Sequence, residues 1–386
     1  MVVRNFGPFL LDDSFVYTFF PLLAIVGVVL YVKSKEASKL AKERVAAAPY
    51  SLWEPNRRPK PNDIKNMLSS FLQEPVTPTT NIDILSSPPV PFRPYKPIYH
   101  MTMGIEKCVP NDLFLLDSSY PDRIALRKQL TSQYSTITLG ASPLATDAIQ
   151  ELYTYLISHH MPSRFPHLFT VDTEKSSFTN HVSGDTHPLE PPGPSLAALK
   201  ILASTVEEDI LILQRDPQEE IYRLRAFIAC FPNGFDSSQK MNLPLREIHE
   251  PVPMFKEKLA PSMDRFFNKL EVGKWVKRFN WTISTHNKLF LPTENHVYEG
   301  EEIPDELESV DLETTYLRVE RQVLFRLPVS KAMIFFVRTY LTPLKAVKAE
   351  GQGEALATAI EGMPEKLAFY KRRGVWGKAV TVALRA

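Results

Sequence analysis

Five short runs of β-branched and aromatic residues limit the folds open to this chain. Each run partly alternates between apolar and polar residues, as a strand with one buried face does. None is followed by the regular helix that a parallel crossover requires, and only Pro328–Ala332 joins the last two. An antiparallel sheet of about five strands is therefore expected. The runs are Asp209–Gln214, Tyr222–Phe231, Lys277–Ser284, Leu317–Leu327 and Met333–Leu341.

Helical periodicity surrounds these runs, which predicts an α+β fold with helices flanking the sheet. A helix over Met254–Leu270 carries apolar residues at spacings of three and four, so one of its faces can pack on the sheet. Two segments, Asp172–Pro194 and the acidic Glu294–Glu313, are expected to be loops. A short strand is expected at His100–Lys107, and further helices at Arg123–Tyr134, Pro143–His159, Pro194–Ser204 and Glu354–Tyr370, the last broken at Met363-Pro364.

An uncharged run of 18 residues, Phe15–Val32, lies near the N-terminus. As a helix it would span about 27 Å, just enough to cross a bilayer, so it predicts one transmembrane helix ahead of the sheet. A cleaved signal peptide is the alternative, but acidic rather than basic residues precede the run. Basic residues cluster after it, which predicts a cytosolic C-terminal side and a single-pass protein, with the endoplasmic reticulum as the expected membrane.

Proline is concentrated after this run. Residues 49–97 hold eleven of the chain's 33 prolines, a density typical of extended, semi-rigid chain. Four segments are therefore expected. They are a short lumenal N-terminus at 1–14, a membrane anchor at 15–32, a basic and then proline-rich linker at 33–91, and a globular body at 92–386.

Composition and motifs exclude several classes of protein. Lys and Arg (45) nearly balance Asp and Glu (44), so nucleic acid is not an expected partner. The only cysteines, Cys108 and Cys230, cannot supply a four-thiolate metal site and are interpreted as free thiols. The sequence contains no glycine-rich phosphate loop, no Gly-x-Ser-x-Gly nucleophile motif and no His-Glu-x-x-His zinc motif.

One histidine lies in a segment that prolines make rigid. His249 falls between a β-type run and the predicted amphipathic helix, and Pro251 and Pro253 follow it. A rigid imidazole beside apolar residues is what a five-coordinate heme needs from a protein. From spacing alone, a structural histidine in the core or at a helix cap is the simpler interpretation.

Four charged residues, Arg318, Glu320, Arg321 and Arg338, interrupt two otherwise apolar β-type runs. A buried arginine needs a partner, here Glu320 or a ligand carboxylate such as a heme propionate. Strand alternation separates Arg318 and Glu320 from Arg321, so only one set is expected to face inward. A structural ion pair at the sheet edge is the alternative. Three aromatic residues on these and a neighbouring run either line a pocket or pack in the core: Phe279, Trp281 and Tyr340.

Six sequence blocks occur in the order found in a known family, over residues 92–370. Together they resemble the heme-dependent oxidative N-demethylases. The blocks are His100–Gly104, Ile248–Pro253, Asp264–Phe267, Arg278–Trp281, Leu317–Gln322 and Val337–Tyr340.

This resemblance implies a PAS-like heme domain with a five-stranded antiparallel sheet. It implies heme b as cofactor, O2 as co-substrate and a small N-methylated amine whose methyl carbon is released as formaldehyde. His249 would be the axial iron ligand, Glu320, Arg321 and Arg338 would contact propionate, oxygen or substrate, and Arg318 would contact the heme. Phe279, Trp281 and Tyr340 would line the cofactor pocket.

Electrons must come from a partner reductase, because the sequence contains no flavin or iron–sulfur motif. Two other functions stay open at this point. The first is a heme-binding sensor or carrier without turnover. The second is a secretory-pathway glycosyltransferase, which an anchor and a proline-rich stem would suit, although the chain has no Asp-x-Asp motif.

Overall fold

The structure is a computed structural model that describes residues 76–81, 83–99, 102–298 and 300–386. The chain divides into a unit of residues 1–60 and a unit of residues 61–386, and every described residue belongs to the second. The predicted N-terminus (1–14), anchor (15–32) and first part of the linker (33–75) lie outside the described residues. In the described part, no helix is both long and apolar enough to cross a membrane, so the transmembrane helix of the expected fold is not supported.

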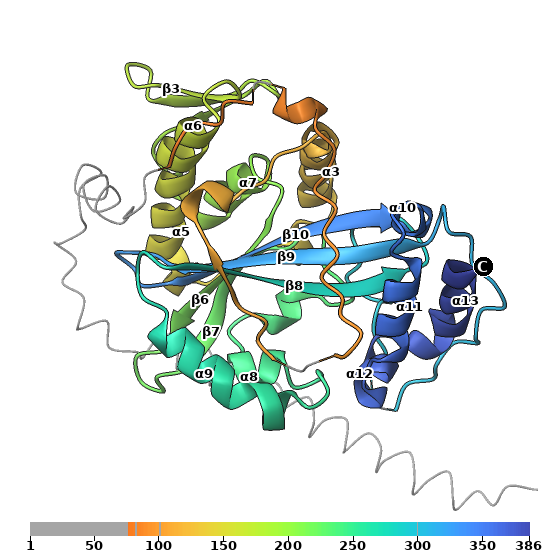
Figure 1. The fold of residues 1–386 in the computed structure, drawn as a ribbon. Coiled ribbons are helices and arrows are strands. Elements are labelled where there is room, and N and C mark those ends of the chain that lie inside the picture. Colours follow the sequence, from red (N-terminus) through yellow and green to blue (C-terminus); the bar gives the residue numbers. More distant parts are fainter. Residues whose placement is uncertain (1–75, 82, 100–101, 299) are drawn as a thin grey trace, which may run out of the picture. The chain divides into compact units, whose positions relative to one another are not determined.

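The centre of the fold is an antiparallel sheet of seven strands in the order β1-β8-β9-β10-β6-β7-β2 (Figure 1). The expected number of five was too low. The two additional strands, β1 (Glu106–Cys108) and β2 (Leu139–Ala141), have three residues each, too few to show alternation. β1 overlaps only the end of the short strand predicted at His100–Lys107, which was not counted in the sheet, and β2 was not predicted. They form the two edges of the sheet. The five long strands match the five β-type runs: β6 (Asp209–Arg215), β7 (Tyr222–Ile228), β8 (Trp275–Ser284), β9 (Tyr316–Arg326) and β10 (Met333–Pro343).

A second sheet of three strands occupies much of the segment that was expected to be a loop. Its strands are β3 (Phe169–Asp172), β4 (Ser177–Asn180) and β5 (Asp185–Pro188). Each has only four residues among many turn-forming ones, which hides the alternation in the sequence. The buried rings of Phe169 and Phe178 stack at 5.7 Å and fasten this sheet to the core.

Most of the longer helices lie where the periodicity predicts them, but one long helix, α13, and several short ones were not predicted. The break at Met363-Pro364 is confirmed. Described residues of 294–313 form neither helix nor strand, as predicted. Predicted helices correspond to α3 (Tyr120–Gln133), η3 (Pro143–Ala145) with α5 (Thr146–Tyr153), the π-helical η4 (Thr154–His160) and α6 (Met161–Arg164), α7 (Ser195–Ala203), the π-helical η6 (Phe255–Leu259) with α9 (Ala260–Lys269), α11 (Gly353–Glu361) and α12 (Glu365–Tyr370). The unpredicted ones are η1 (Ile84–Ser86), η2 (Pro110–Asp112), α4 (Ser135–Thr138), η5 (Ser237–Lys240), α8 (Leu245–Ile248), α10 (Leu344–Ala349) and α13 (Arg373–Arg385).

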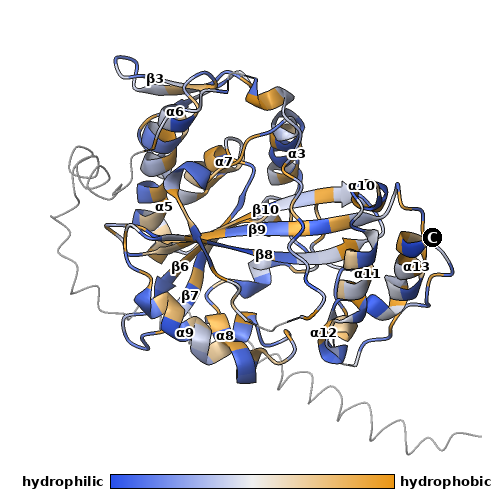
Figure 2. Cartoon of the chain, viewed as in Figure 1, coloured by the Kyte–Doolittle hydropathy of each residue, from blue (hydrophilic) through white to orange (hydrophobic). Residues whose placement is uncertain are grey.

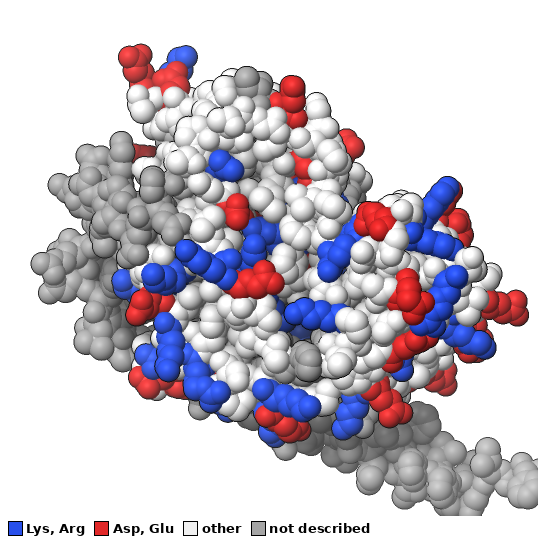
Figure 3. All heavy atoms as spheres, in the orientation of Figure 1, with Lys and Arg blue, Asp and Glu red and all other residues white. Residues whose placement is uncertain are grey.

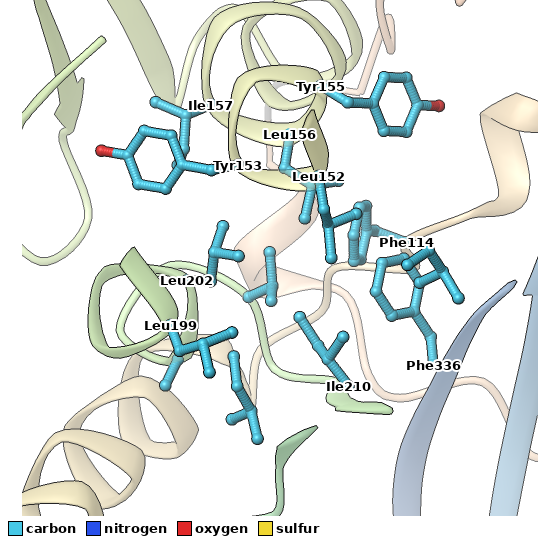
Figure 4. Packing of buried hydrophobic residues seen from close by; sticks show 14 of the residues in the cluster. Phe114, Leu152, Tyr153, Tyr155, Leu156, Ile157, Leu199, Leu202, Ile210 and Phe336 are labelled. Carbon is cyan, nitrogen blue, oxygen red and sulfur yellow. The ribbon is translucent and has the colours of Figure 1, made fainter. Parts of the chain in front are cut away.

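Helices cover both faces of the large sheet, and the flanking helices carry apolar and polar stretches side by side (Figures 1 and 2). On one face, which we call the α5 face, Leu152 and Leu199 pack toward Ile210 of β6 and Phe336 of β10 (Figure 4). On the other, which we call the α9 face, side chains of η6 and α9 pack on Leu324 of β9. The long strands therefore bury side chains on both faces of the sheet.

The described end of the predicted linker packs against the body. The backbone N–H of Thr79 donates to the carbonyl of Arg164 at 2.8 Å, and that of Ser118 donates to Ser87 at 2.8 Å. These hydrogen bonds show that residues 76–91 have contacts of their own with the body, unlike a free stalk.

Candidate functional site

Strand β9 sends its charged residues to both faces of the sheet. Arg318, Glu320 and Gln322 point to the α9 face, whereas Arg321 points to the α5 face, because successive side chains of a strand alternate. All four are buried, with exposed fractions of 0%, 7%, 9% and 2%. The expectation that only one set faces inward was wrong, since both faces are covered.

Arg338 lies on the α5 face, directly opposite Arg321 in the strand register. Its guanidinium contacts the carboxylates of Asp117 at 2.7 Å and Glu207 at 2.8 Å, and it donates to the carbonyl of Leu115. Burial would lower its pKa, but the charges of Glu207, Tyr340 and Glu208 outweigh burial and raise it. Arg338 is thus fully engaged in an internal charge cluster.

Arg321 and the three predicted aromatic residues also lie on the α5 face. Arg321 donates to the backbone carbonyls of Asp112 and Leu113. Phe92 contacts the rings of Phe279 and Tyr340, with centroids 4.9 and 5.1 Å away, and Tyr95 packs on Trp281 at 6.0 Å. These contacts are those of a core, and none of the four shares a face with His249, Arg318 or Glu320.

Arg318 lies at one end of the α9 face and joins two loops. Its guanidinium donates to the carbonyls of Phe231 (2.9 Å) and Pro232 (3.1 Å), after β7, and of Lys288 (3.1 Å) and Leu289 (3.2 Å), after β8. Burial lowers its pKa to about 10. These bonds use both terminal nitrogens, so Arg318 is engaged with backbone.

A row of polar side chains runs along β8 and β9 on the α9 face. The register pairs Arg278 with Gln322 and Asn280 with Glu320. One carboxylate oxygen of Glu320, Oε2, accepts hydrogen bonds from Gln322 at 3.0 Å and Asn280 at 3.4 Å. No described residue donates to Oε1. This carboxylate is held in place by two amides and keeps one oxygen free for a ligand.

Lys371, just after α12, extends this row from a distant part of the sequence. Its Nζ donates to Asn280 Oδ1 at 3.1 Å and to the carbonyl of Trp281, and it lies 5.5 Å from the Trp281 ring centroid. Because lysine only donates and a carboxylate only accepts, the two bonds fix the orientation of the Asn280 amide between Lys371 and Glu320. Burial lowers the pKa of Lys371 from 10.5 to about 8, although Glu320 opposes the shift.

This shift predicts a pH dependence of stability. Between pH 8 and 10.5 the unfolded chain keeps the lysine proton that the folded chain releases, so the Lys371 contribution to the unfolding free energy increases with pH. The shift corresponds to about 3 kcal/mol. The unfolding free energy, measured with urea at pH 7.5 and pH 10, should therefore rise less with pH in Lys371→Met than in wild type. The exposed Lys378→Met is the control and should show the same rise as wild type. An equal rise in all three proteins would contradict a lowered pKa of Lys371.

His249 follows α8 directly and its ring is oriented by two contacts. Nδ1 lies 2.8 Å from the carbonyl of Leu245, and the ring stacks on Phe255 with centroids 4.9 Å apart. Burial lowers the pKa of His249, and the positive charge of Arg278 lowers it further, so the imidazole is neutral at pH 7. Since a carbonyl can only accept, Nδ1 carries the proton, and Nε2 has a free lone pair. No described residue occupies Nε2.

The part of the α9 face beside these residues is only partly covered, and we call it the recess. His249, Arg278 and Asn280 keep part of their surface accessible although they lie on a covered face of the sheet. Burial lowers the pKa of Arg278, and the charges of Tyr99 and Glu320 oppose this shift only in part. Arg278 in turn lowers the pKa of His249, so it interacts with both ends of the recess. The surface in Figure 3 is hollowed near its centre, with Lys or Arg atoms at the hollow.

The chemistry of the recess suits a heme. A histidine whose Nδ1–H donates to a carbonyl presents Nε2 to a metal in a fixed direction. The described residues contain no group of three or more His, Cys, Asp or Glu side chains able to hold a metal ion, whereas a heme needs only one protein ligand. Phe255, which stacks on the His249 ring, belongs to an apolar cluster on this face. Met103, Leu211, Val252 and Phe335 pack against that cluster, and Ile248, next to His249 in the chain, packs against a neighbouring one.

Sequence reasoning missed four residues of this site: Arg278, Asn280, Gln322 and Lys371. Three of them lie in sequence blocks that were singled out, and the strand register would have placed them beside Glu320. Lys371 lies at a helix end and carries no pattern that points to the sheet.

Comparison with known families agrees with this site. Residues 104–381 match the family described as haem-dependent oxidative N-demethylase, alpha subunit-like. The match extends from β1 to α13 and includes His249, the polar row on β8 and β9, and Lys371. Because it covers well over half of the chain, the protein belongs to the haem-dependent oxidative N-demethylase, alpha subunit-like family.

Proposed function

We propose that this protein is a heme-dependent oxygenase that removes a methyl group from a small N-methylated amine in the recess on the α9 face. The observation that carries the proposal is that Arg278 interacts electrostatically with two groups on the α9 face: His249, which has a free imidazole nitrogen, and Glu320, whose carboxylate has one free oxygen. Membership of the N-demethylase family supports the reaction type.

His249 would bind the iron of heme b through Nε2, and the Leu245 carbonyl would keep the ring in the required orientation. When bound, the heme supplies the activation of O2 and the oxidation of the methyl carbon. Overall, one oxygen atom leaves in formaldehyde and the other in water, and the two electrons required come from a separate reductase.

Glu320 would orient the amine. Its Oε1 accepts an N–H of the substrate, while Gln322 and Asn280 prevent the carboxylate from rotating. The neutral amine is the reactive form, because its nitrogen lone pair can assist oxidation at the neighbouring methyl carbon.

The test begins with purified full-length protein reconstituted with hemin. Absorption spectra with and without dithionite and CO establish heme binding, and formaldehyde release is then measured for a panel of methylamines with O2 and a chemical or enzymatic reductant. Full heme occupancy with verified reduction but no formaldehyde from any amine would favour a sensor or carrier instead.

Glu320→Gln is expected to weaken amine binding by about tenfold to a hundredfold, the cost of one charged hydrogen bond, while heme content is unchanged. Apparent amine affinity follows from formaldehyde yield against amine concentration at equal heme occupancy. Glu313→Gln, at an exposed glutamate paired with Lys345, is the matched control and should match wild type. Equal affinities in Glu320→Gln and wild type would remove Glu320 from the site.

A further inference from the structure

Arg278, which is half-buried, differs from the buried arginines of the sheet. Arg318 and Arg321 donate to backbone carbonyls, and Arg338 pairs with carboxylates. No described residue forms a hydrogen bond or an ion pair with Arg278, and its Nε is buried without a partner. A guanidinium nitrogen that is buried without a partner is costly to keep, so its retention points to a ligand that reaches this guanidinium from the accessible side.

The surroundings of Arg278 favour a single negative charge. Across the strands it faces Gln322, which is neutral, and Glu320 is the diagonal neighbour. Glu320 acts on Arg278 only at a distance, outside ion-pair range, and is already held by two amides. A doubly charged phosphate would be repelled by Glu320, whereas a planar carboxylate matches the guanidinium in charge and in shape.

We propose that Arg278 is a carboxylate-binding residue of the recess, which rests on the proposed function in placing cofactor and substrate there. The carboxylate has two possible sources. One is a heme propionate. The other is the carboxylate of an N-methylated amino acid, whose nitrogen lies at Glu320 while its carboxylate lies at Arg278.

The first arm of the experiment compares heme affinity for hemin and for hemin dimethyl ester, whose propionates are uncharged. It uses wild type, Arg278→Gln, Arg278→Lys and the exposed control Arg265→Gln. If Arg278 holds a propionate, Arg278→Gln binds hemin about tenfold to a hundredfold more weakly, while its affinity for the diester equals that of wild type. Arg278→Lys keeps the positive charge but not the planar guanidinium, so its hemin affinity should lie between those of wild type and Arg278→Gln.

The second arm compares binding of dimethylamine and N,N-dimethylglycine to the ferric heme-loaded proteins, followed by the change in the Soret spectrum. If Arg278 holds the substrate carboxylate, wild type prefers dimethylglycine and Arg278→Gln loses that preference without losing heme. The proposal is overturned if Arg278→Gln matches wild type for hemin, its diester and both amines.

Neither arm depends on turnover, so the proposed function and the carboxylate site can fail separately. If formaldehyde is not released but the affinities differ as expected, only the proposed function is contradicted. If the protein takes up no heme, calorimetry with dimethylglycine decides the carboxylate site, because Arg278→Gln should then bind it at least about tenfold more weakly.

Discussion

Arg338→Met is expected to destabilise the folded protein by about 3–5 kcal/mol, the usual cost of removing one partner from a buried charge cluster. The substitution roughly conserves volume, so the loss is electrostatic. It leaves Asp117 and Glu207 buried without their cation, and both are at most 3% exposed. Urea unfolding at pH 7 measures the loss.

The matched control is Arg385→Met. Arg385 also contacts two glutamates, Glu354 and Glu361, but at the surface, where such pairs contribute little. Burial raises the pKa of Glu207 to about 7, even with Arg338 beside it. The destabilisation should therefore shrink as the pH falls below 7 and Glu207 takes up a proton. If Arg338→Met were as stable as wild type but had lost heme, Arg338 would instead be a residue of the active site.

His249→Ala is expected to lower heme affinity by more than about a hundredfold, because even residues that only orient a metal ligand contribute tenfold to a hundredfold. The far-ultraviolet dichroism should stay the same, since α8 has only four residues and its backbone is unaffected. Hemin titration followed at the Soret band measures the change. Added imidazole, which can occupy the vacated position, should restore part of the wild-type ferric spectrum.

The exposed His167→Ala is the control and should titrate as wild type does. Stoichiometric heme with an unchanged ferric spectrum in His249→Ala would show that a different residue is the axial ligand. His249 would then be a structural residue of the α8 segment, with its contacts to Leu245 and Phe255 as its role.

The long elements of this fold could be predicted because their patterns are long. β9 and β10 have 11 residues each, enough for a run of β-branched and aromatic residues to be recognised, and α9 carries its apolar residues at helical spacing. β2, with three residues, gives no such signal, and β1, also with three, overlaps only the end of the short strand predicted at His100–Lys107. The strand count was wrong for that reason.

The candidate site was predicted only in part because a charged residue in an apolar strand indicates a partner without identifying it. Arg338 and Glu320 look alike in the sequence, yet one meets carboxylates brought by other segments and the other keeps a free oxygen. Lys371 reaches Asn280 across 91 positions of the chain, and such long-range contacts leave no local pattern.

The two-sided burial of β9 has a consequence for how this protein can change during evolution. Inserting or deleting one residue in β9 would exchange its two sets of side chains, moving Arg321 into the recess and Glu320 toward the backbone carbonyls that Arg321 now contacts. The contacts on both faces of the sheet would therefore be lost together. Relatives with different substrates should therefore differ by substitutions at positions 318, 320 and 322, or in the surrounding loops, and keep the length of this strand unchanged.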